Sequence, residues 1–241
     1  MNTWFESGHV AIVTGGSRGL GKALARELAA HGLHTIIDGR DRRSLDAASD
    51  DLRRFGNVSA IAGDVTRSEH VRALFDEARR LGRLDLVVNN ASTLGAVPLP
   101  RMNDIAHRTL AHLFDVNVFA PIHLMQHALA FWRQNGGAGT LVNITSDAAV
   151  EPYASWGGYG AAKAALEHVS RVLAVELEAA RVRVLVEDPG DMNTQMHRDA
   201  IPDADPQSLR DPAESARALM HAIATMDGPY QRVRLSDLVI A

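Results

Sequence analysis

Apolar segments of the kind that form buried strands alternate with helical segments along nearly the whole chain. The first, "HVAIVTGG", is a β-branched run that stops at glycine, and the helix after it carries Leu20, Leu24 and Leu28 on one stripe. Six further strand-like runs follow: LHTIID, NVSAIAGD, RLDLVVNNA, GTLVNITS, RVRVLVEDPG and YQRVRL. The two longest helical segments are expected from about Asn103 to Gln134 and from Ser155 to Ala180. This alternation predicts an α/β fold with a parallel sheet and helices on both faces. Because no linker or repeat interrupts it, we expect one domain over residues 1–241.

Composition excludes several classes of function. The formal charge is −4 with acidic and basic residues interspersed, so no basic tract is present to follow a nucleic acid. The sequence has no cysteine, which excludes disulfides and thiolate catalysis. Its start lacks the charged and apolar regions of a signal peptide, and no apolar run approaches the roughly 20 residues of a membrane span. We therefore expect a cytoplasmic protein without membrane or nucleic-acid partners.

Three glycines stand at the junction of the first expected strand and helix. They are Gly15, Gly19 and Gly21 in "TGGSRGLG". Glycines allow a tight turn and a close approach of the backbone to a pyrophosphate, and a helix N-terminus supplies free N–H groups. A merely structural turn is the alternative, but the strand-turn-helix context favours a dinucleotide site.

Tyr159 and Lys163 lie four positions apart at the start of an expected helix, so their side chains share one face. A phenol with a pKa of about 10 is a poor proton donor or base at neutral pH. A neighbouring ammonium favours the phenolate, so Lys163 is expected to lower the pKa of Tyr159. Taken alone, the two could be ordinary surface residues of a helix.

Several motifs together resemble those of the short-chain dehydrogenase/reductase family. In chain order they are the loop G-x-x-x-G-x-G, NNA at Asn89–Ala91, Asn117 in FDVNVFAP, Ser146 thirteen residues before Tyr159, Y-x-x-x-K, and PGDMNT at Pro189–Thr194. They stand at the family's spacing from about Val10 to Met196. The resemblance implies a doubly wound, Rossmann-type fold and nicotinamide-dependent interconversion of a carbonyl and an alcohol.

The resemblance also implies the roles of the site residues. The catalytic set would be Asn117, Ser146, Tyr159 and Lys163. Tyr159 would pass a proton to the substrate oxygen and Ser146 would donate a hydrogen bond to it. Lys163 would also bind the ribose hydroxyls, and Asn117 would hold a water behind the lysine. Substrate-binding residues would be Ser146, Asp147, Tyr159 and Asp191.

The expected cofactor site draws on residues that follow most of the strands. These are Gly15, Ser17, Arg18, Gly19, Leu20, Gly21, Arg40, Asp64, Val65, Asn90, Ala91, Tyr159, Lys163, Pro189, Gly190 and Thr194. Asp38 is a candidate for binding the ribose of NAD, but the family pattern places Gly39 at the acid's position and points Asp38 to the opposite face. Arg18 and Arg40 suit a 2′-phosphate. We expect NADP(H) to be preferred and NAD(H) to be possible.

Some features depart from the family or lie outside its motifs. Ser92 stands where a glycine usually follows NNA and could narrow the nicotinamide side of the pocket. His123 and His127 lie four apart on a helix, but no third ligand is evident and we expect no metal. An apolar stripe, formed by Leu166, Val169, Leu173 and Leu177, could pack in the core or join subunits in a homodimer or homotetramer.

The sequence thus predicts an NADP(H)-dependent carbonyl reductase or alcohol dehydrogenase that acts on a small molecule. A 3-oxoacyl-thioester reductase is the rival among enzymes, and a non-catalytic NADP-binding regulator is the rival of another class. Residues 193–212 are expected to form a substrate lid. Acids near the site, namely Asp147, Glu151, Glu187, Asp188 and Asp191, would repel anionic substrates such as acyl thioesters if they border the crevice. They could equally be solvated loop residues.

Overall fold

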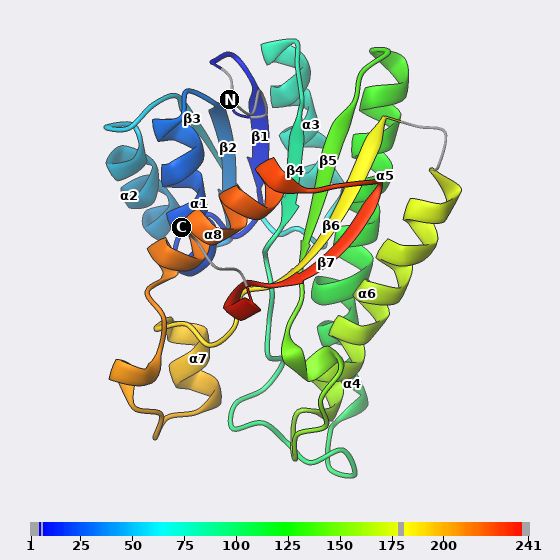
Figure 1. Cartoon of the computed structure of the whole chain (residues 1–241). Coiled ribbons are helices and arrows are strands. Elements are labelled where there is room, and N and C mark those ends of the chain that lie inside the picture. The colour runs from blue at the N-terminus through cyan, green and yellow to red at the C-terminus, as the bar shows by residue number, and fades with distance from the viewer. Residues whose placement is uncertain (1–4, 6, 178–180, 238–241) are drawn as a thin grey trace.

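A single sheet of seven parallel strands forms the centre of the molecule (Figure 1). The structure is a computed structural model and describes residues 5, 7–177 and 181–237. The strands are β1 (Val10–Val13), β2 (His34–Gly39), β3 (Val58–Ala62), β4 (Leu86–Asn89), β5 (Gly139–Ile144), β6 (Val182–Asp188) and β7 (Tyr230–Arg234). Their spatial order is β3-β2-β1-β4-β5-β6-β7, and each pair is parallel. The predicted doubly wound sheet is confirmed.

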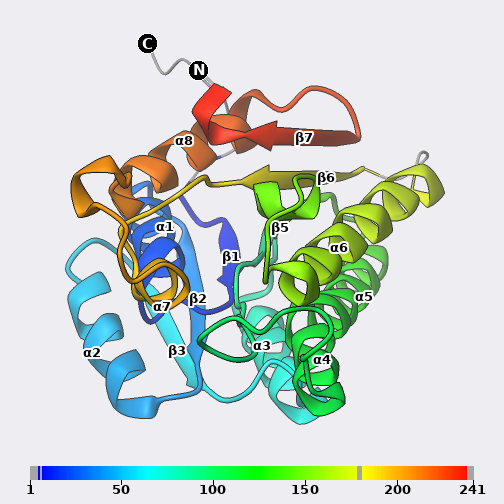
Figure 2. The ribbon, with the colours of Figure 1, turned by 90° about the horizontal axis from the view of Figure 1, so that it is seen from below.

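Helices cover both faces of the sheet (Figure 2). One apolar core lies beneath α1 (Gly19–Ala30), α2 (Arg42–Leu52) and α8 (Pro212–Thr225). The other lies beneath α3 (Ser68–Leu81), α5 (Ala120–Gln134) and α6 (Gly157–Glu176). Leu20, Leu24 and Leu28 are buried in the first core, as their spacing predicts. The apolar stripe on α6 packs against the second core. Of the two alternatives for these residues, core packing and a subunit contact, the structure thus shows core packing.

The chain order places a switch point between β1 and β4. The chain runs outward from β1 to β3 on one side, then returns to β4 beside β1 and runs outward to β7. Loops that leave the carboxyl ends of β1 and β4 therefore diverge, and ligands of open α/β sheets bind in the crevice this creates. The glycine loop follows β1 and the NNA motif ends β4, so both border the switch point.

The long helix expected from Asn103 to Gln134 is two helices. α4 (His107–Phe114) and α5 are joined by a π-helical turn over Asp115–Phe119, and Asn117 lies in that turn. One extra residue per turn re-aims the side chains, and such turns are frequent at functional sites. The helix expected from Ser155 to Ala180 spans Gly157–Glu176, and residues 178–180 lie outside the described residues.

The predicted lid is a folded segment rather than an open loop. It contains α7 (Gln195–Ala200) and a 3₁₀ turn over Pro206–Ser208. Its two ends are joined by a bridge between Met192 and Arg210, with Arg210 N donating to Asp191 O at 3.0 Å. α7 lies at the same end of the sheet as α4 (Figure 1). No helix in the described part of the chain is long and apolar enough to span a membrane.

Candidate active site

One large crevice of about 1030 Å³ opens at the carboxyl ends of the strands. Its lining brings together residues from the loops after all six strands from β1 to β6 and from the lid. Of the residues that the sequence singles out for cofactor, substrate and catalysis, all line it except Gly21 and Asn117. Both lie next to residues of the lining: Gly21 packs against Gly15, and Asn117 bonds Thr93.

The glycine loop fits the phosphates of a dinucleotide. Gly15 and Gly19 have φ angles of +67° and +55°, where other L residues are strained. A Cβ on Gly21 would lie 2.4 Å from Gly15 O, so only glycine allows the loop and helix to approach this closely. No side chain caps the N-terminus of α1 among the described residues. Its first N–H groups and the positive end of its dipole therefore face the crevice, as an anion site requires.

Asp38 supports this loop instead of facing a ribose. It is buried, accepts a hydrogen bond from Gly15 N at 2.6 Å, and pairs with His70 Nε2 at 2.9 Å. Its carboxylate is thus fully engaged within the protein. Gly39, which carries no side chain, and Arg40 follow it at the end of β2, and both line the crevice. The end of β2 therefore presents the Arg40 guanidinium to the crevice and no carboxylate at the position of Gly39.

Ser146 begins the turn after β5 and belongs to a short chain of hydrogen bonds. Its hydroxyl donates to Asp147 Oδ1 at 2.9 Å, and Tyr153 Oη donates to Asp147 Oδ2 at 2.8 Å. These donors hold the pKa of Asp147 below its ordinary value, although burial opposes the shift. The sequence reasoning did not identify Tyr153, whose only signal is its place between Ser146 and Tyr159.

The geometry of Tyr159 and Lys163 differs from the sequence expectation. Lys163 Nζ donates to Ile144 O at 2.8 Å and lies 5.5 Å from the centre of the Tyr159 ring. The ammonium thus faces the backbone and the ring. Burial raises the pKa of the Tyr159 phenol, whereas burial lowers the pKa of Lys163 to about 8. The prediction that Lys163 lowers the pKa of Tyr159 is wrong for this structure: burial raises the pKa of the phenol, and the charges of Asp188 and Asp147 raise it further.

Asn117 is buried and anchors the loop after β4. Its Nδ2 donates to Thr93 O at 2.9 Å, and its Oδ1 accepts from Thr93 N at 3.0 Å and from Ser92 Oγ at 2.9 Å. The π-helical turn aims the amide at this loop. Asn117 therefore fixes the wall of the crevice next to Tyr159, and its carbonyl oxygen is occupied by two donors.

Three of the five acids considered from the sequence border the crevice, and a cation partly offsets their charge. Asp147, Asp188 and Asp191 line the crevice, whereas Glu187 does not. Asp188 pairs with Arg234 Nε of β7 at 3.3 Å. Strand alternation separates Asp188 from Glu187, and the cation from β7 reduces the negative field at the mouth.

Glu187 is instead fully buried beneath the crevice. Neither of its carboxylate oxygens has a hydrogen-bond partner among the described residues. Burial, reinforced by the charge of Asp188, raises the pKa of Glu187 well above its ordinary value, while Arg210 and Lys163 oppose the shift. An ionised carboxylate here is costly, so Glu187 destabilises the fold where it must ionise.

We expect Glu187→Gln to raise the melting temperature more at pH 8 than at pH 5. The pKa of Glu187 is raised in the folded state, so its stabilising contribution is complete below the unfolded pKa and is lost as pH rises through the folded pKa. Glutamine resembles the protonated acid and does not titrate. Each kcal/mol gained shifts the melting temperature by roughly 2–4 °C in a chain of this size.

Thermal unfolding followed by circular dichroism at several pH values checks this expectation. Glu151→Gln is the matched control, because Glu151 is an exposed carboxylate in a neighbouring loop. Equal pH dependence of the two variants would show that Glu187 is not the titrating group.

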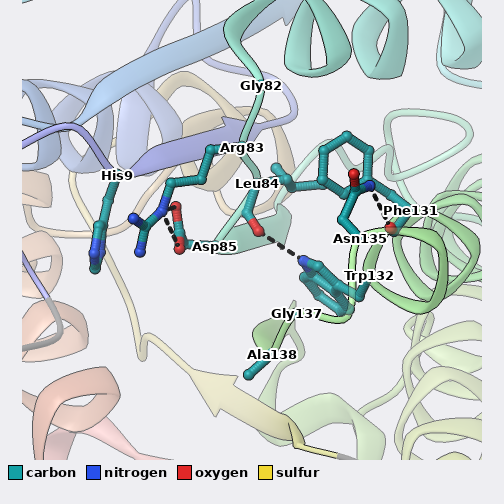
Figure 3. Close-up of a pocket in the computed structure, with 10 residues that line it drawn as sticks. All are labelled: His9, Gly82, Arg83, Leu84, Asp85, Phe131, Trp132, Asn135, Gly137 and Ala138. Atoms are coloured by element: carbon teal, nitrogen blue, oxygen red, sulfur yellow. Dashed lines mark hydrogen bonds and ion pairs between the residues drawn. The ribbon is translucent and has the colours of Figure 1, made fainter.

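A second, smaller hollow of about 560 Å³ lies at the amino ends of β1, β4 and β5, and Figure 3 shows the residues that line it. Its polar side chains are largely bonded to one another or to the backbone. Arg83 Nε contacts both carboxylate oxygens of Asp85 at 2.8 Å, and Trp132 Nε1 donates to Leu84 O at 2.7 Å.

The rings of His123 and His127 meet edge to face at 4.8 Å. No group of metal-ligating side chains large enough to hold an ion occurs among the described residues.

Known proteins resemble this chain in sequence. The family model of the short chain dehydrogenases matches residues 9–205. A benzil reductase ((S)-benzoin forming) of Saccharomyces cerevisiae is 30% identical over 240 residues, which span 97% of this chain and 90% of that protein.

Two solved structures share the fold over nearly their whole length. A 7α-hydroxysteroid dehydrogenase in complex with NADH and 7-oxo-glycochenodeoxycholic acid has a TM-score of 0.84 and 25% identity, covering 96% of this chain and 95% of that one. A metagenomic short-chain oxidoreductase in complex with NADP has a TM-score of 0.77 and 29% identity, covering 95% and 98%. With its doubly wound sheet, its glycine loop and the family match over residues 9–205, the chain belongs to the short chain dehydrogenase family of oxidoreductases.

Proposed function

We propose that this protein is an NADP(H)-preferring oxidoreductase that interconverts a carbonyl group and a secondary alcohol. One observation carries the proposal: Ser146, Tyr159 and Lys163 line the same crevice as the glycine loop. The nicotinamide would supply the hydride, so the chain itself must hold the substrate and manage one proton.

Tyr159 is the proton donor in this proposal. Burial raises the pKa of its phenol and keeps it protonated at neutral pH, which makes it a weaker acid than free tyrosine. It can still give the proton to the substrate oxygen, because the alkoxide that forms as hydride arrives is more basic than a phenolate. The Ser146 hydroxyl can turn from Asp147 to donate to the same oxygen. Lys163 would hold the ribose hydroxyls, as the resemblance to the family implies. Asn117 would fix the wall of the crevice through its bonds to Thr93.

The substrate end of the crevice is apolar. Leu94, Trp156 and Met196 line it, and the Trp156 ring meets the Tyr159 ring edge to face at 5.6 Å. The relatives named above act on benzil and bind an oxo-steroid, which are both carbonyl compounds with large apolar frames. We therefore propose a largely apolar carbonyl substrate, and the acids that line the mouth favour one without negative charge.

A 3-oxoacyl-thioester reductase remains the rival among enzymes. Acyl thioesters of coenzyme A and carrier proteins are anionic, and Asp147, Asp188 and Asp191 line the mouth. Arg234 pairs with Asp188 and also acts on Asp147, but one cation offsets three carboxylates only in part, so this group of acids disfavours an anion.

A carbonyl panel assayed by NADPH absorbance tests the proposal. It should contain aryl and alicyclic ketones beside an acetoacetyl thioester, at low and at high salt. We expect turnover of neutral ketones and a weaker reaction of the thioester at low salt. Preference for the thioester at low salt would favour the rival enzyme. NADPH binding without turnover of any carbonyl would favour the non-catalytic regulator.

We also propose a homo-oligomer. The predicted stripe on α6 is part of the core, but Val172 and Val175 on the outer side of the same helix are 43% and 75% exposed. Exposed apolar side chains on one helix are often covered by a second subunit. A dimeric or tetrameric mass by light scattering is expected at micromolar concentration, and a monomeric mass would contradict it.

The cytoplasmic location expected from the sequence stays a prediction.

A further inference from the structure

The hydroxyl of Ser146 is engaged on two sides within its own turn. It donates to Asp147 Oδ1 at 2.9 Å and accepts a hydrogen bond from Ala148 N at 3.2 Å. An ionised carboxylate accepts hydrogen bonds and has no proton to give. Burial would raise the pKa of Asp147, but its hydrogen-bond donors hold that pKa below the ordinary value, so Asp147 is ionised at neutral pH. The bond therefore has one direction, and the proton of Ser146 points at Asp147.

The carboxylate of Asp147 is fixed by two further donors. Its Oδ1 accepts from Ala148 N at 2.7 Å, and its Oδ2 accepts from Tyr153 Oη at 2.8 Å. Both donors belong to the segment that follows β5, so the carboxylate is held in place by its own loop. A hydrogen bond to an ionised acceptor is roughly twice as strong as one between neutral groups. Asp147 is thus a strong competitor for the proton of Ser146.

A ligand in the crevice therefore meets a lone pair of Ser146 instead of its proton. Ser146, Asp147 and Tyr159 all line the crevice. A serine hydroxyl has one proton and two lone pairs, and here the proton and one lone pair already have partners. A ketone oxygen has no proton for the remaining lone pair, so it gains a bond from Ser146 only if the hydroxyl leaves Asp147. An alcohol can donate to Ser146 and accept from the Tyr159 phenol at once.

We propose that Asp147 is a positioning residue that holds the proton of Ser146 and so makes the site bind a secondary alcohol more tightly than the corresponding ketone. The inference rests on the proposed function, because Ser146 and Tyr159 meet the substrate oxygen there. Asp147 takes up no proton during the reaction and acts through Ser146. A ketone still reacts, but the Ser146 hydroxyl must turn away from Asp147 to donate to it.

Asp147→Ala tests the inference with the fastest-reacting aryl ketone of the carbonyl panel and with its own alcohol. Ser146 is then free to donate to the carbonyl, so the KM of the ketone should fall by about fivefold, the gain from one net hydrogen bond. The KM of the alcohol should stay within about twofold, because the lone pair of Ser146 remains available to it. The overall equilibrium fixes the ratio of kcat/KM in the two directions, so the gain for the alcohol appears in kcat when cofactor binding is unchanged. A merely structural Asp147 would lower kcat in both directions instead.

Asp147→Asn separates the hydrogen bond from the charge. Ala148 N keeps the amide oxygen on the side of Ser146, so the serine retains a neutral acceptor. The KM of the ketone should therefore fall by only about twofold, since a neutral acceptor holds the proton less strongly. Equal KM values in the two variants would show that the charge acts by itself, which would overturn the inference. Because the amide preserves the bond to Ala148 N, this variant also serves where Asp147→Ala does not fold.

Glu151→Ala is the matched control for charge. Glu151 is an exposed carboxylate whose backbone N–H bonds Asp147 O, but it lies outside the crevice lining. Its loss should leave the KM of ketone and alcohol within about twofold of the parent, because exposed charges are screened by salt. A fall in the KM of the ketone equal to that in Asp147→Ala would overturn the inference.

A double variant shows whether Asp147 acts through Ser146. Asp147→Ala placed in a Ser146→Ala background should leave the affinity for the ketone within about twofold, because the hydroxyl that transmits the effect is gone. Calorimetric titration of the ketone into enzyme loaded with oxidised cofactor measures this affinity without turnover. A fivefold gain in that background, or none in Asp147→Ala alone, would overturn the inference and leave the proposed function intact. Failure of the parent to turn over any carbonyl would instead overturn the proposed function.

Discussion

Replacing Tyr159 by phenylalanine is expected to reduce turnover of the best carbonyl substrate by about a thousandfold, the typical contribution of a positioned proton donor. The ring volume is kept, so the edge contact with Trp156 and the packing around Leu113 remain. Only the hydroxyl that can reach a substrate oxygen is lost. NADPH should still bind, because the glycine loop that fits its phosphates is unaffected.

Steady-state kinetics and NADPH fluorescence titration measure the two effects separately. Tyr230→Phe is the matched control, since Tyr230 lies on β7 and does not line the crevice. Lys163→Ala should weaken both turnover and cofactor binding, because Lys163 lines the crevice on the side of Tyr159 and is buried. If Tyr159→Phe keeps most of its activity, another group donates the proton.

The sheet could be predicted because each strand can be recognised from the residues of its own segment. Buried parallel strands are short apolar runs bounded by glycine or polar residues, and the helices between them carry apolar stripes of their own. Leu24 and Leu28 are fully buried where their spacing places them. The interruption before α5 could not be predicted, because nothing in the local pattern around Asn117 marks a π-helical turn.

The lining of the site was also predictable to a large extent, since motif residues follow strands and all strands end at one edge. The ion-pair and hydrogen-bond partners of these residues could not be predicted from the sequence. Asp188 meets Arg234 across 46 positions, and Asp38 meets His70 across 32. Such pairs depend on how β6 lies against β7 and how α3 crosses β2, which only the assembled fold determines.

The protonation of the titratable side chains in and near the site could not be predicted from the sequence either. Spacing alone placed Lys163 beside Tyr159, but it could not show that burial raises the pKa of the phenol. Nor could it show that Glu187 is buried with no hydrogen-bond partner for its carboxylate among the residues that the structure describes. An unpaired buried acid costs stability, so its presence next to Asp188 indicates that the carboxyl end of β6 is not optimised for stability alone.

Arg40→Asp is expected to lower the ratio of catalytic efficiencies with NADPH and NADH by about a hundredfold and to bring the preference close to NADH. Arg40 and Arg18 line the end of the crevice beyond Gly39, where a guanidinium can bond a 2′-phosphate. A hydrogen bond to a charged group contributes roughly 1.5–3 kcal/mol, and replacing the cation by an anion adds repulsion of the phosphate.

Initial rates with both cofactors, measured at low and at high salt, check this expectation. Arg43→Asp makes the same charge change on the exposed side of α2, outside the crevice lining, and should leave the ratio within about threefold of the parent, because exposed charges are screened by salt. The effect of Arg40→Asp should persist at high salt, since a direct contact is screened less than a distant charge. Equal efficiency of the parent with NADPH and NADH would refute the assignment, because Asp38 is engaged with Gly15 and His70 and no acid stands at the position of Gly39 to favour NADH.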